Sequence, residues 1–144
     1  MTTQNYANHA RFVPMYHYVL STLLVLTLIG SVVNLVQSIG DPERRYSASL
    51  IVVLTLCSCL LFYFCRTFPL KAQDRAIRTE ENLRHFAMTG KLFDPRLTMS
   101  QIIALRFASD AEFVELARKA ADANMPAADI KRAVKNWRAD NYRA

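Results

Sequence analysis

The side chains that could do chemistry in this chain of 144 residues are few and scattered. Its three cysteines, Cys57, Cys59 and Cys65, lie within or at the end of one apolar run, and its three histidines are far apart in the sequence. A structural zinc site needs converging Cys or His ligands, which usually include closely spaced pairs such as Cys-x-x-Cys. No such pair occurs, and Cys57 and Cys59 fall on different faces of a helix. The sequence therefore predicts no metal site, and cysteines in this setting are usually small packed side chains.

The sequence also lacks the patterns that accompany catalysis. It contains no Gly-rich phosphate loop, no His-Glu-x-x-His, and no serine with a plausible His and Asp. The carboxylates Asp110, Glu112 and Asp129 fall where helices are expected to begin. Acidic side chains in a first helical turn are explained by the helix dipole. We therefore expect a protein that is not an enzyme and that has no cofactor.

Two apolar runs, residues 15–39 and 47–65, dominate the first half of the chain. As a helix, each run is long enough to cross the hydrocarbon core of a bilayer, which is about 30 Å thick. Neither run contains Asp, Glu, Lys or Arg, and the connector between them is short. We therefore expect a polar segment at 1–12 and an antiparallel transmembrane hairpin at 13–66. The first run is too long for a signal peptide and lacks an Ala-x-Ala site, which indicates an uncleaved anchor.

The distribution of basic residues predicts how this hairpin is oriented. Lys and Arg near the ends of spans stay on the cytoplasmic side of the membrane. Of the 18 Lys and Arg, 15 lie from Arg66 onward, one is Arg11, and two are Arg44 and Arg45 in the turn. The turn arginines count against this orientation, although two carboxylates beside them balance their charge. We expect both termini in the cytoplasm and the turn on the outer face.

Small and polar side chains follow one face of each predicted span, because they are spaced three or four residues apart. In lipid, small residues let two helices approach closely, and hydroxyl and amide groups form hydrogen bonds across the contact. We therefore expect a helix–helix seam. The alternative is a polar pathway through the membrane, but such pathways usually carry an ionisable group and this one does not. The predicted seam consists of Thr27, Gly30, Ser31, Asn34 and Ser38 in the first span and Thr55, Ser58 and Cys59 in the second.

A long charged helix is predicted to follow the second span, over about residues 70–89 within a juxtamembrane region at 67–97. Pro69 is expected to kink or restart the helix, and Gly90 to end it as a C-cap. This segment has a narrow apolar stripe with a helical period. The stripe consists of Ala72, Ala76, Thr79, Leu83, Phe86 and Gly90.

The last part of the chain, residues 98–144, is predicted to form a small domain of three short helices. Thr98-x-x-Gln101 and Ser109-x-x-Glu112 match the capping box, which predicts helix starts near Met99 and Asp110. A third helix is expected from Pro126 through about Arg138. The predicted fold class is thus all-α: a transmembrane hairpin, a long juxtamembrane helix and a small cytosolic three-helix bundle.

The third of these helices carries a basic face that could bind an anionic partner. Acidic lipid headgroups are one candidate, since each basic side chain near them contributes about 1 kcal/mol. Nucleic acid is a less favoured candidate, because any three-helix bundle loosely resembles a helix-turn-helix. A solvated helix face is the remaining interpretation. The predicted basic surface consists of Lys131, Arg132, Lys135 and Arg138.

Several segments are similar to a family of small bacterial two-span membrane proteins that carry a domain of unknown function. The resemblance covers nearly the whole chain and implies a multi-pass protein of the bacterial inner membrane with a cytosolic helical tail. It implies no activity. Where the family often has Ser before the Pro that opens the last helix, this chain has Met125. The matching segments are QNYANH (4–9), RFVPMYH (11–17), QDRAIRTEENLR (73–84), QIIALRFASD (101–110) and IKRAVKNW (130–137).

Together these patterns favour a non-enzymatic integral membrane protein that presents a basic cytosolic domain for protein–protein assembly. The small predicted bundle is near the lower size limit for an independent core, so we expect it to lean on a partner. That partner is either a second copy of the chain or a larger membrane complex. An oligomeric channel or transport accessory, with the seam stripe lining a pore, is one alternative. Binding of anionic lipid or nucleic acid through the last helix is the other.

Overall fold

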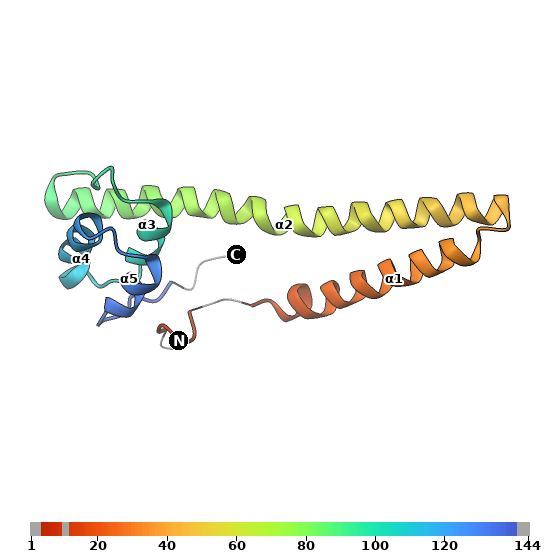
Figure 1. Ribbon diagram of the computed structural model, residues 1–144. Helices are drawn as coiled ribbons and strands as arrows, with labels where there is room; N and C mark the ends of the chain where they lie inside the picture. The colour runs from red at the N-terminus through yellow and green to blue at the C-terminus, as the bar shows by residue number, and fades with distance from the viewer. Residues whose placement is uncertain (1–3, 10–11, 141–144) are drawn as a thin grey trace. The chain divides into compact units, whose positions relative to one another are not determined.

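The computed structural model describes residues 4–9 and 12–140, and within these ranges the chain is all-helical (Figure 1). The described residues contain five α-helices and no strand, which confirms the predicted all-α class; the only β feature among them is an isolated bridge between Ala108 and Trp137. A π-helical turn, η1, precedes the first α-helix. The elements are η1 (Met15–Leu20), α1 (Ser21–Gln37), α2 (Pro42–Thr89), α3 (Met99–Leu105), α4 (Asp110–Asp122) and α5 (Ala127–Ala133).

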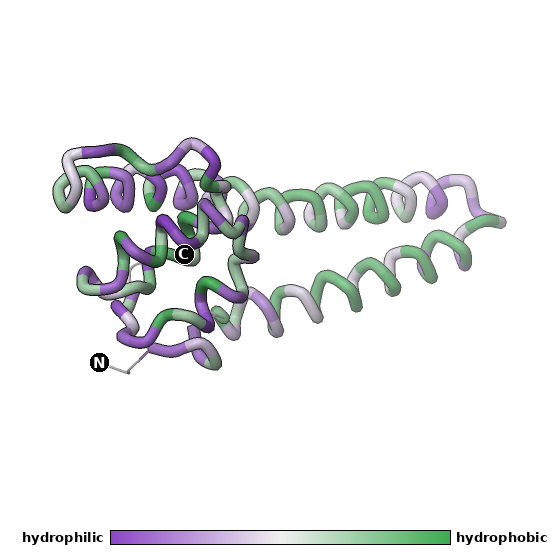
Figure 2. The backbone as a smooth tube through the Cα atoms, turned by 60° about the vertical axis from the view of Figure 1, so that its left-hand side comes forward, coloured by the Kyte–Doolittle hydropathy of each residue, from purple (hydrophilic) through white to green (hydrophobic). Residues whose placement is uncertain are grey.

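The described residues divide into two compact units. Residues 12–68 form one, which we call the apolar unit, and residues 69–140 together with 4–9 form the other, which we call the charged unit. Helix α2 contributes to both. Figure 2 shows apolar residues concentrated on α1 and the first part of α2, with hydrophilic residues interspersed through the rest. The first half of α2 is therefore mainly apolar, whereas its second half mixes hydrophilic and apolar residues.

Two helices are long and apolar enough to cross a membrane: the first at Met15–Gln37 and the second within Pro42–Thr89. Only 6% and 11% of their respective apolar windows is buried by the chain itself. The second helix begins earlier than the predicted span because Pro42 suits a first helical turn. The Asp41 carboxylate also accepts the backbone N–H groups of Glu43 and Arg44, at 3.1 and 3.3 Å. The predicted turn is therefore shortened by this cap.

Helix α2 continues through Pro69 instead of restarting there, which corrects one of the two predicted outcomes. A proline inside a helix removes one backbone hydrogen bond. A helix as long as α2 can tolerate this loss, because the hydrogen-bonded turns before and after the proline remain. The helix ends as predicted at Gly90, whose φ of 72° is the left-handed conformation of a C-cap. The Gly90 N–H donates to the carbonyl of Phe86 at 2.7 Å.

The core of the charged unit is formed by α3, α4 and α5. Phe113, Ile102, Leu105 and Ile130 are its largest fully buried apolar side chains that pack in one cluster. The predicted capping box at Thr98 is present, with the Thr98 side chain and the Gln101 side chain bonded reciprocally to backbone. Both predicted helix starts are confirmed, at Met99 and Asp110. These caps fix where each short helix enters the core.

The third helix of this unit is shorter than predicted. Helix α5 ends at Ala133, and the following residues, 134–140, which we call the tail, are not helical. The tail instead pairs with the loop after α3. The Arg138 N–H donates to the carbonyl of Phe107 at 2.8 Å, and the Ser109 N–H donates to the carbonyl of Asn136 at 3.1 Å. These bonds replace the helical ones, and they draw the tail across the loop.

The face of α2 that the charged unit buries is also different from the predicted apolar stripe. Ile77 and Glu81 are each 6% exposed, whereas Leu83 and Phe86 are 64% and 49% exposed. Leu83 and Phe86 therefore point away from α3–α5. Glu81 is buried on this face because Arg84 on the same helix and Arg138 from the tail pair with its carboxylate.

Candidate functional site

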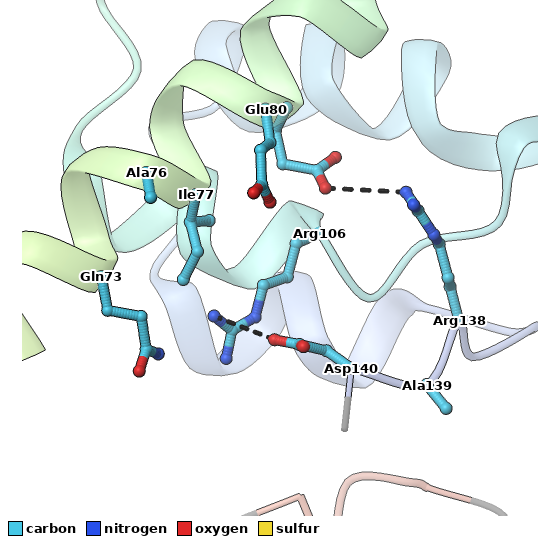
Figure 3. A pocket seen from close by; sticks show the side chains of 9 residues that line it. Gln73, Ala76, Ile77, Glu80, Arg106, Arg138, Ala139 and Asp140 are labelled. Carbon is cyan, nitrogen blue, oxygen red and sulfur yellow. Dashed lines mark ion pairs between the residues drawn. The ribbon is translucent and has the colours of Figure 1, made fainter. Parts of the chain in front are cut away.

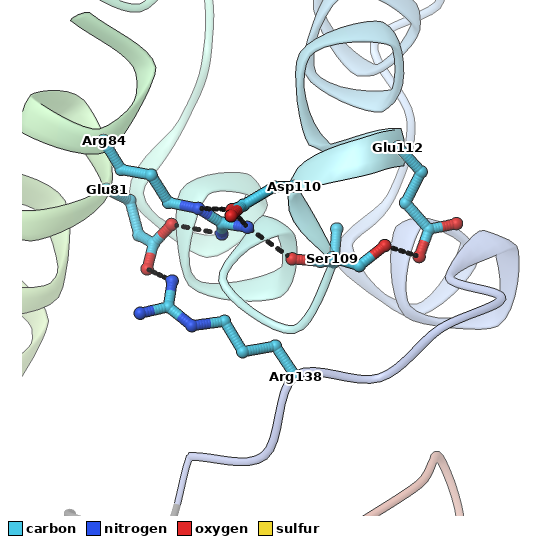
Figure 4. A network of polar contacts seen from close by, with 7 residues as sticks. Glu81, Arg84, Ser109, Asp110, Glu112 and Arg138 are labelled. Atoms are coloured by element: carbon cyan, nitrogen blue, oxygen red, sulfur yellow. Dashed lines mark hydrogen bonds and ion pairs between the residues drawn. The ribbon is translucent and has the colours of Figure 1, made fainter. Parts of the chain in front are cut away.

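A network of charged side chains joins α2 to the rest of the charged unit (Figure 4). Arg84 Nη1 lies 3.0 Å from one carboxylate oxygen of Glu81, and Arg138 Nη1 lies 3.6 Å from the other. Burial raises the pKa of Glu81, while the hydrogen bond and charge of Arg84 and the charge of Arg138 act in the opposite direction. The net pKa of Glu81 is raised, so its two arginines offset only part of the cost of burying the carboxylate.

Arg84 is the centre of this network. Its Nε donates to the carboxylate of Asp110 at 2.8 Å, and its Nη2 donates to the carbonyl of Ala108 at 2.8 Å. Its guanidinium carbon lies 4.0 Å from the ring centroid of Phe113, which is a cation–π contact. The hydrogen bond from Arg84, together with its charge, lowers the pKa of Asp110. One side chain thus ties α2 to the start of α4 and to the core.

A pocket of about 170 Å³ adjoins this network (Figure 3). The two arginines in its wall are both engaged with carboxylates: Arg138 with Glu81, and the buried Arg106 with Asp140 at 3.3 Å. The residues described around it include no Ser, Cys or His, so its wall offers ion pairs and no nucleophile. This composition is that of a structural charge cluster. The lining residues are Gln73, Ala76, Ile77, Glu80, Glu81, Arg106, Arg138, Ala139 and Asp140.

The N-terminal residues 4–9, which we call the strap, lie against α5 and the tail. His9 Nε2 is 3.0 Å from the Nζ of Lys131, and the Asp140 N–H donates to the Oε1 of Gln4 at 2.8 Å. The guanidinium carbon of Arg132 lies 5.4 Å from the ring centroid of Tyr6. Nothing in the sequence predicts the strap, since its residues are polar and aperiodic and their partners are far along the chain.

The predicted basic surface is divided in the structure. Lys131 and Arg132 lie against the strap, and Arg132 also pairs with an adjacent carboxylate in α5. Lys135 and Arg138 lie beyond the end of α5, so the four do not share one helix face. Arg138 is held by the buried Glu81. Three of these four side chains already form the contacts described above. An anionic partner would have to compete with those contacts at every one of the four positions except Lys135.

The predicted seam residues are placed in two groups. Ser31, Ser38 and Thr55 are buried in the apolar unit, with Ser58 and Cys59 half-buried beside them, whereas Thr27, Gly30 and Asn34 are exposed. The hydroxyl groups of the serines and threonines donate to carbonyls of their own helix, three or four residues earlier. These bonds are Thr27 to Leu23, Ser31 to Leu28, Ser38 to Asn34, Thr55 to Ile51 and Ser58 to Leu54.

Cysteine and histidine side chains do not gather in the described parts of the chain. Within residues 4–9 and 12–140, no three His, Cys, Asp or Glu side chains converge as metal ligands do. The three cysteines are free thiols, with Cys57 and Cys65 exposed and Cys59 half-buried. The described residues therefore offer surfaces and ion pairs, but no arrangement suited to metal chemistry.

The carboxylate of Glu112 anchors the tail and makes its attachment sensitive to pH. The Ser109 side chain makes no cap bond to the backbone, so the predicted capping box is incomplete, and its hydroxyl instead donates to the Glu112 carboxylate at 3.3 Å. The oxygens of Glu112 also accept the N–H groups of Lys135 and Asn136, at 3.1 and 3.0 Å. Partial burial opposes its charge, but these backbone bonds outweigh that effect and lower the pKa of Glu112 below its ordinary value of 4.5.

This lowered pKa predicts that acid releases the tail. The stabilising contribution is fully present above pH 4.5, and it is lost as the pH falls through the lower pKa of the folded state. We expect amide exchange at Lys135 and Asn136, relative to the intrinsic rate, to be faster near pH 3 than near pH 6. In Glu112→Gln this difference should disappear, because the amide does not titrate. Hydrogen exchange with residue-level resolution measures it.

A matched control separates this effect from general acid sensitivity. Glu115→Gln alters an exposed carboxylate on the same helix and should leave the pH dependence of exchange in the tail unchanged. Asp94, whose pKa its Arg96 partner lowers to about 2, also titrates, but it lies in the loop before α3. Exchange in the tail that stays pH-dependent in Glu112→Gln would show that another group holds it.

Comparison with known proteins identifies a family and no closer relative. The sequence profile of a family of unknown function, DUF6526, matches residues 1–144. No curated protein and no solved structure matches the chain. The match confirms the resemblance to a family that carries a domain of unknown function. The bacterial and membrane parts of that resemblance stay predictions.

Proposed function

Because the chain belongs to the DUF6526 family, whose function is unknown, we propose a role from its own residues. We propose that it is a non-enzymatic membrane protein of the bacterial inner membrane. In this proposal the apolar unit is a transmembrane hairpin, and the charged unit is a cytosolic helical domain that serves protein–protein assembly. The observation that carries the proposal is helix α2, which combines a span-length apolar half with a half built into a folded domain.

The exposure of the apolar helices supports the membrane part of this proposal. A core helix of a water-soluble protein is mostly buried by its own chain, whereas 6% and 11% of these two apolar windows is buried. Monomeric soluble proteins rarely leave such large contiguous apolar surfaces in water. Helices satisfy their own backbone hydrogen bonds, so lipid can cover these side chains at no cost in unpaired groups.

Contacts within the apolar unit support the hairpin. The ring of Tyr16 stacks on the ring of Phe62 with centroids 4.3 Å apart, and its hydroxyl donates to the Phe62 carbonyl. Ser31 and Thr55 are each 5% exposed and Ala48 is 1% exposed. Small side chains at such contacts are what lets two helices approach closely in lipid. An aromatic contact thus joins the two proposed spans near one end, and small side chains are buried elsewhere along them.

Membership of the strap in the charged unit supports the proposed topology. The strap precedes the first span and the rest of the charged unit follows the second, so an even number of crossings must separate them. Two spans satisfy this requirement. The concentration of Lys and Arg from Arg66 onward favours the cytoplasm for that side.

Site-specific labelling tests the topology. In a variant without native cysteines, single cysteines at Gln4, Glu43 and Lys91 are treated with a membrane-impermeant maleimide in right-side-out vesicles. We expect labelling at Glu43 only, and labelling at Gln4 and Lys91 only after the membrane is permeabilised. Labelling of only one of Gln4 and Lys91 without permeabilisation would contradict the hairpin, whereas labelling of both but not of Glu43 would reverse its orientation.

The assembly role is tested on the intact complex. We would extract the full chain with a C-terminal tag from its native membrane and determine the mass of the complex together with its protein content. A multiple of 16.4 kDa would support self-assembly, and a defined set of accompanying proteins would support an accessory subunit. A chain that remains a monomer with no accompanying protein would overturn the assembly role.

A further inference from the structure

The side of α2 that faces away from α3–α5 carries an apolar stripe with a heptad period. The successive spacings are four, three, four and three, the pattern of a and d positions in a coiled coil. All of its members are exposed in the single chain. With Ala76 and Leu83 at a, the stripe consists of Ala72, Ala76, Thr79, Leu83 and Phe86.

Most of this stripe is separate from the surface that the charged unit uses for its own packing; Ala76 and the neighbouring Glu80 also border the pocket described above. Ile77, Glu81 and Arg84, which contact the rest of the unit, occupy b and f positions of the same heptads, on the opposite side of the helix. Leu83 and Phe86 instead line a shallow groove with Leu92, which is 63% exposed. Among the described residues, the larger seam side chains Leu83 and Phe86 are therefore left exposed by the fold.

Two charges beside the stripe indicate what would cover it. Arg75 is at g and Glu80 is at the following e position, and both are exposed. In a parallel coiled coil, g of one helix meets the next e of its partner, so Arg75 would meet Glu80 of the second chain, twice by symmetry. In one helix, side chains five positions apart do not face each other. Within the described residues, neither side chain forms an ion pair.

We propose that this stripe is the contact with a second copy of the chain, aligned parallel in a two-fold symmetric pair. In an antiparallel pair g positions face g and e positions face e, so Arg75 would not meet Glu80, and the charges therefore favour the parallel arrangement. The inference rests on the proposed function, because a common orientation in the membrane makes the two copies of α2 parallel. It identifies the assembly partner as the protein itself.

The composition of the stripe suits contact between membrane-anchored helices. Alanine and threonine allow a close approach of the two backbones, and Leu83 and Phe86 supply the larger buried apolar area. The stripe is only about two heptads long, which is short for a coiled coil in solution. Anchoring in one membrane raises the effective concentration of the second helix, so a short seam can hold there.

A charge-swap experiment tests the proposal in lipid vesicles that contain the full chain. Self-association is measured by energy transfer between copies labelled at a C-terminal tag. Arg75→Glu alone, or Glu80→Arg alone, places like charges at both symmetric contacts, and we expect each to weaken association about fivefold or more. The double variant Arg75→Glu with Glu80→Arg should return to within about twofold of the wild type, because opposite charges meet again.

A control variant keeps the outcomes distinct. Lys71→Glu changes an exposed basic side chain at c, outside the seam, and should leave association unchanged. Additive losses in the double variant, or single variants that associate as the wild type does, would overturn this contact. Self-association by another face would leave the proposed assembly role standing. A monomer that co-purifies with another protein would end the self-pairing alone, and a monomer without any accompanying protein would end both proposals.

Discussion

Replacing Arg84 by Met is expected to lower the free energy of unfolding of the charged unit by about 3 kcal/mol or more. Arg84 is 12% exposed and holds Glu81, which is 8% exposed at its side chain. Methionine keeps the length and apolar body of the arginine but leaves the Glu81 carboxylate inside the fold with Arg138 as its nearest cation. It also removes the hydrogen bond to the Ala108 carbonyl and the contact with the Phe113 ring.

Chemical denaturation of the full chain in nanodiscs measures this loss. Trp137 is the only tryptophan and lies in the charged unit, so its fluorescence follows that unit and not the spans. Arg78→Met, an exposed substitution on the same helix, should change the free energy by at most about 0.5 kcal/mol. Arg84→Met combined with Glu81→Leu should recover part of the loss, because no buried charge is left behind. An unfolding midpoint for Arg84→Met equal to that of the wild type would contradict this account.

The parts of the fold that the sequence predicts correctly depend on local signals. Apolar runs of membrane length identify the two long helices without any tertiary information. The box at Thr98 and the glycine at Gly90 specify helix ends through contacts within a few residues. These signals depend only on residues close together in the sequence, so sequence patterns are sufficient to predict the corresponding helices and helix ends.

The tail is a segment for which the local sequence pattern predicts the wrong secondary structure. Helical spacing from Ile130 to Trp137 predicts a helix, but α5 ends at Ala133. The deciding contacts come from outside the segment: the carboxylate of Glu112 accepts two tail N–H groups, and the loop at 107–109 pairs with the tail backbone. Those partners are more than 20 residues away in the chain, and no periodicity within the tail reveals them.

The buried face of α2 was missed for a related reason. The sequence predicts an apolar stripe that includes Leu83 and Phe86, but the structure leaves both exposed and buries Glu81 on another face. Glu81 is tolerated because Arg84 and Arg138 neutralise it, and Arg138 comes from the other end of the domain. The misassigned stripe is informative in itself, since an apolar heptad that the fold does not use is available for another chain.

Phe107→Ala is expected to have a comparably large effect and to release both ends of the charged unit together. Phe107 is fully buried, its ring centroid lies 4.9 Å from that of Trp137 in the tail and 5.8 Å from that of His9 in the strap, and the Arg106 guanidinium lies over its face. Truncating a buried phenylalanine costs about 3–5 kcal/mol, from lost apolar contact and from the cavity left behind.

The location of the increased hydrogen exchange distinguishes this variant from one that is destabilised throughout. We expect hydrogen exchange to rise first in the strap and the tail, with the emission of Trp137 shifted to longer wavelength, while the core around Phe113 keeps more of its protection. Leu92→Ala, which truncates a side chain that is 63% exposed in the same unit, should change neither. Strap and tail that respond separately in Phe107→Ala would mean that they dock independently. A joint response would identify Phe107 as the residue that couples the two ends of the chain, and it would join the segment before the first span to the segment that follows the last helix.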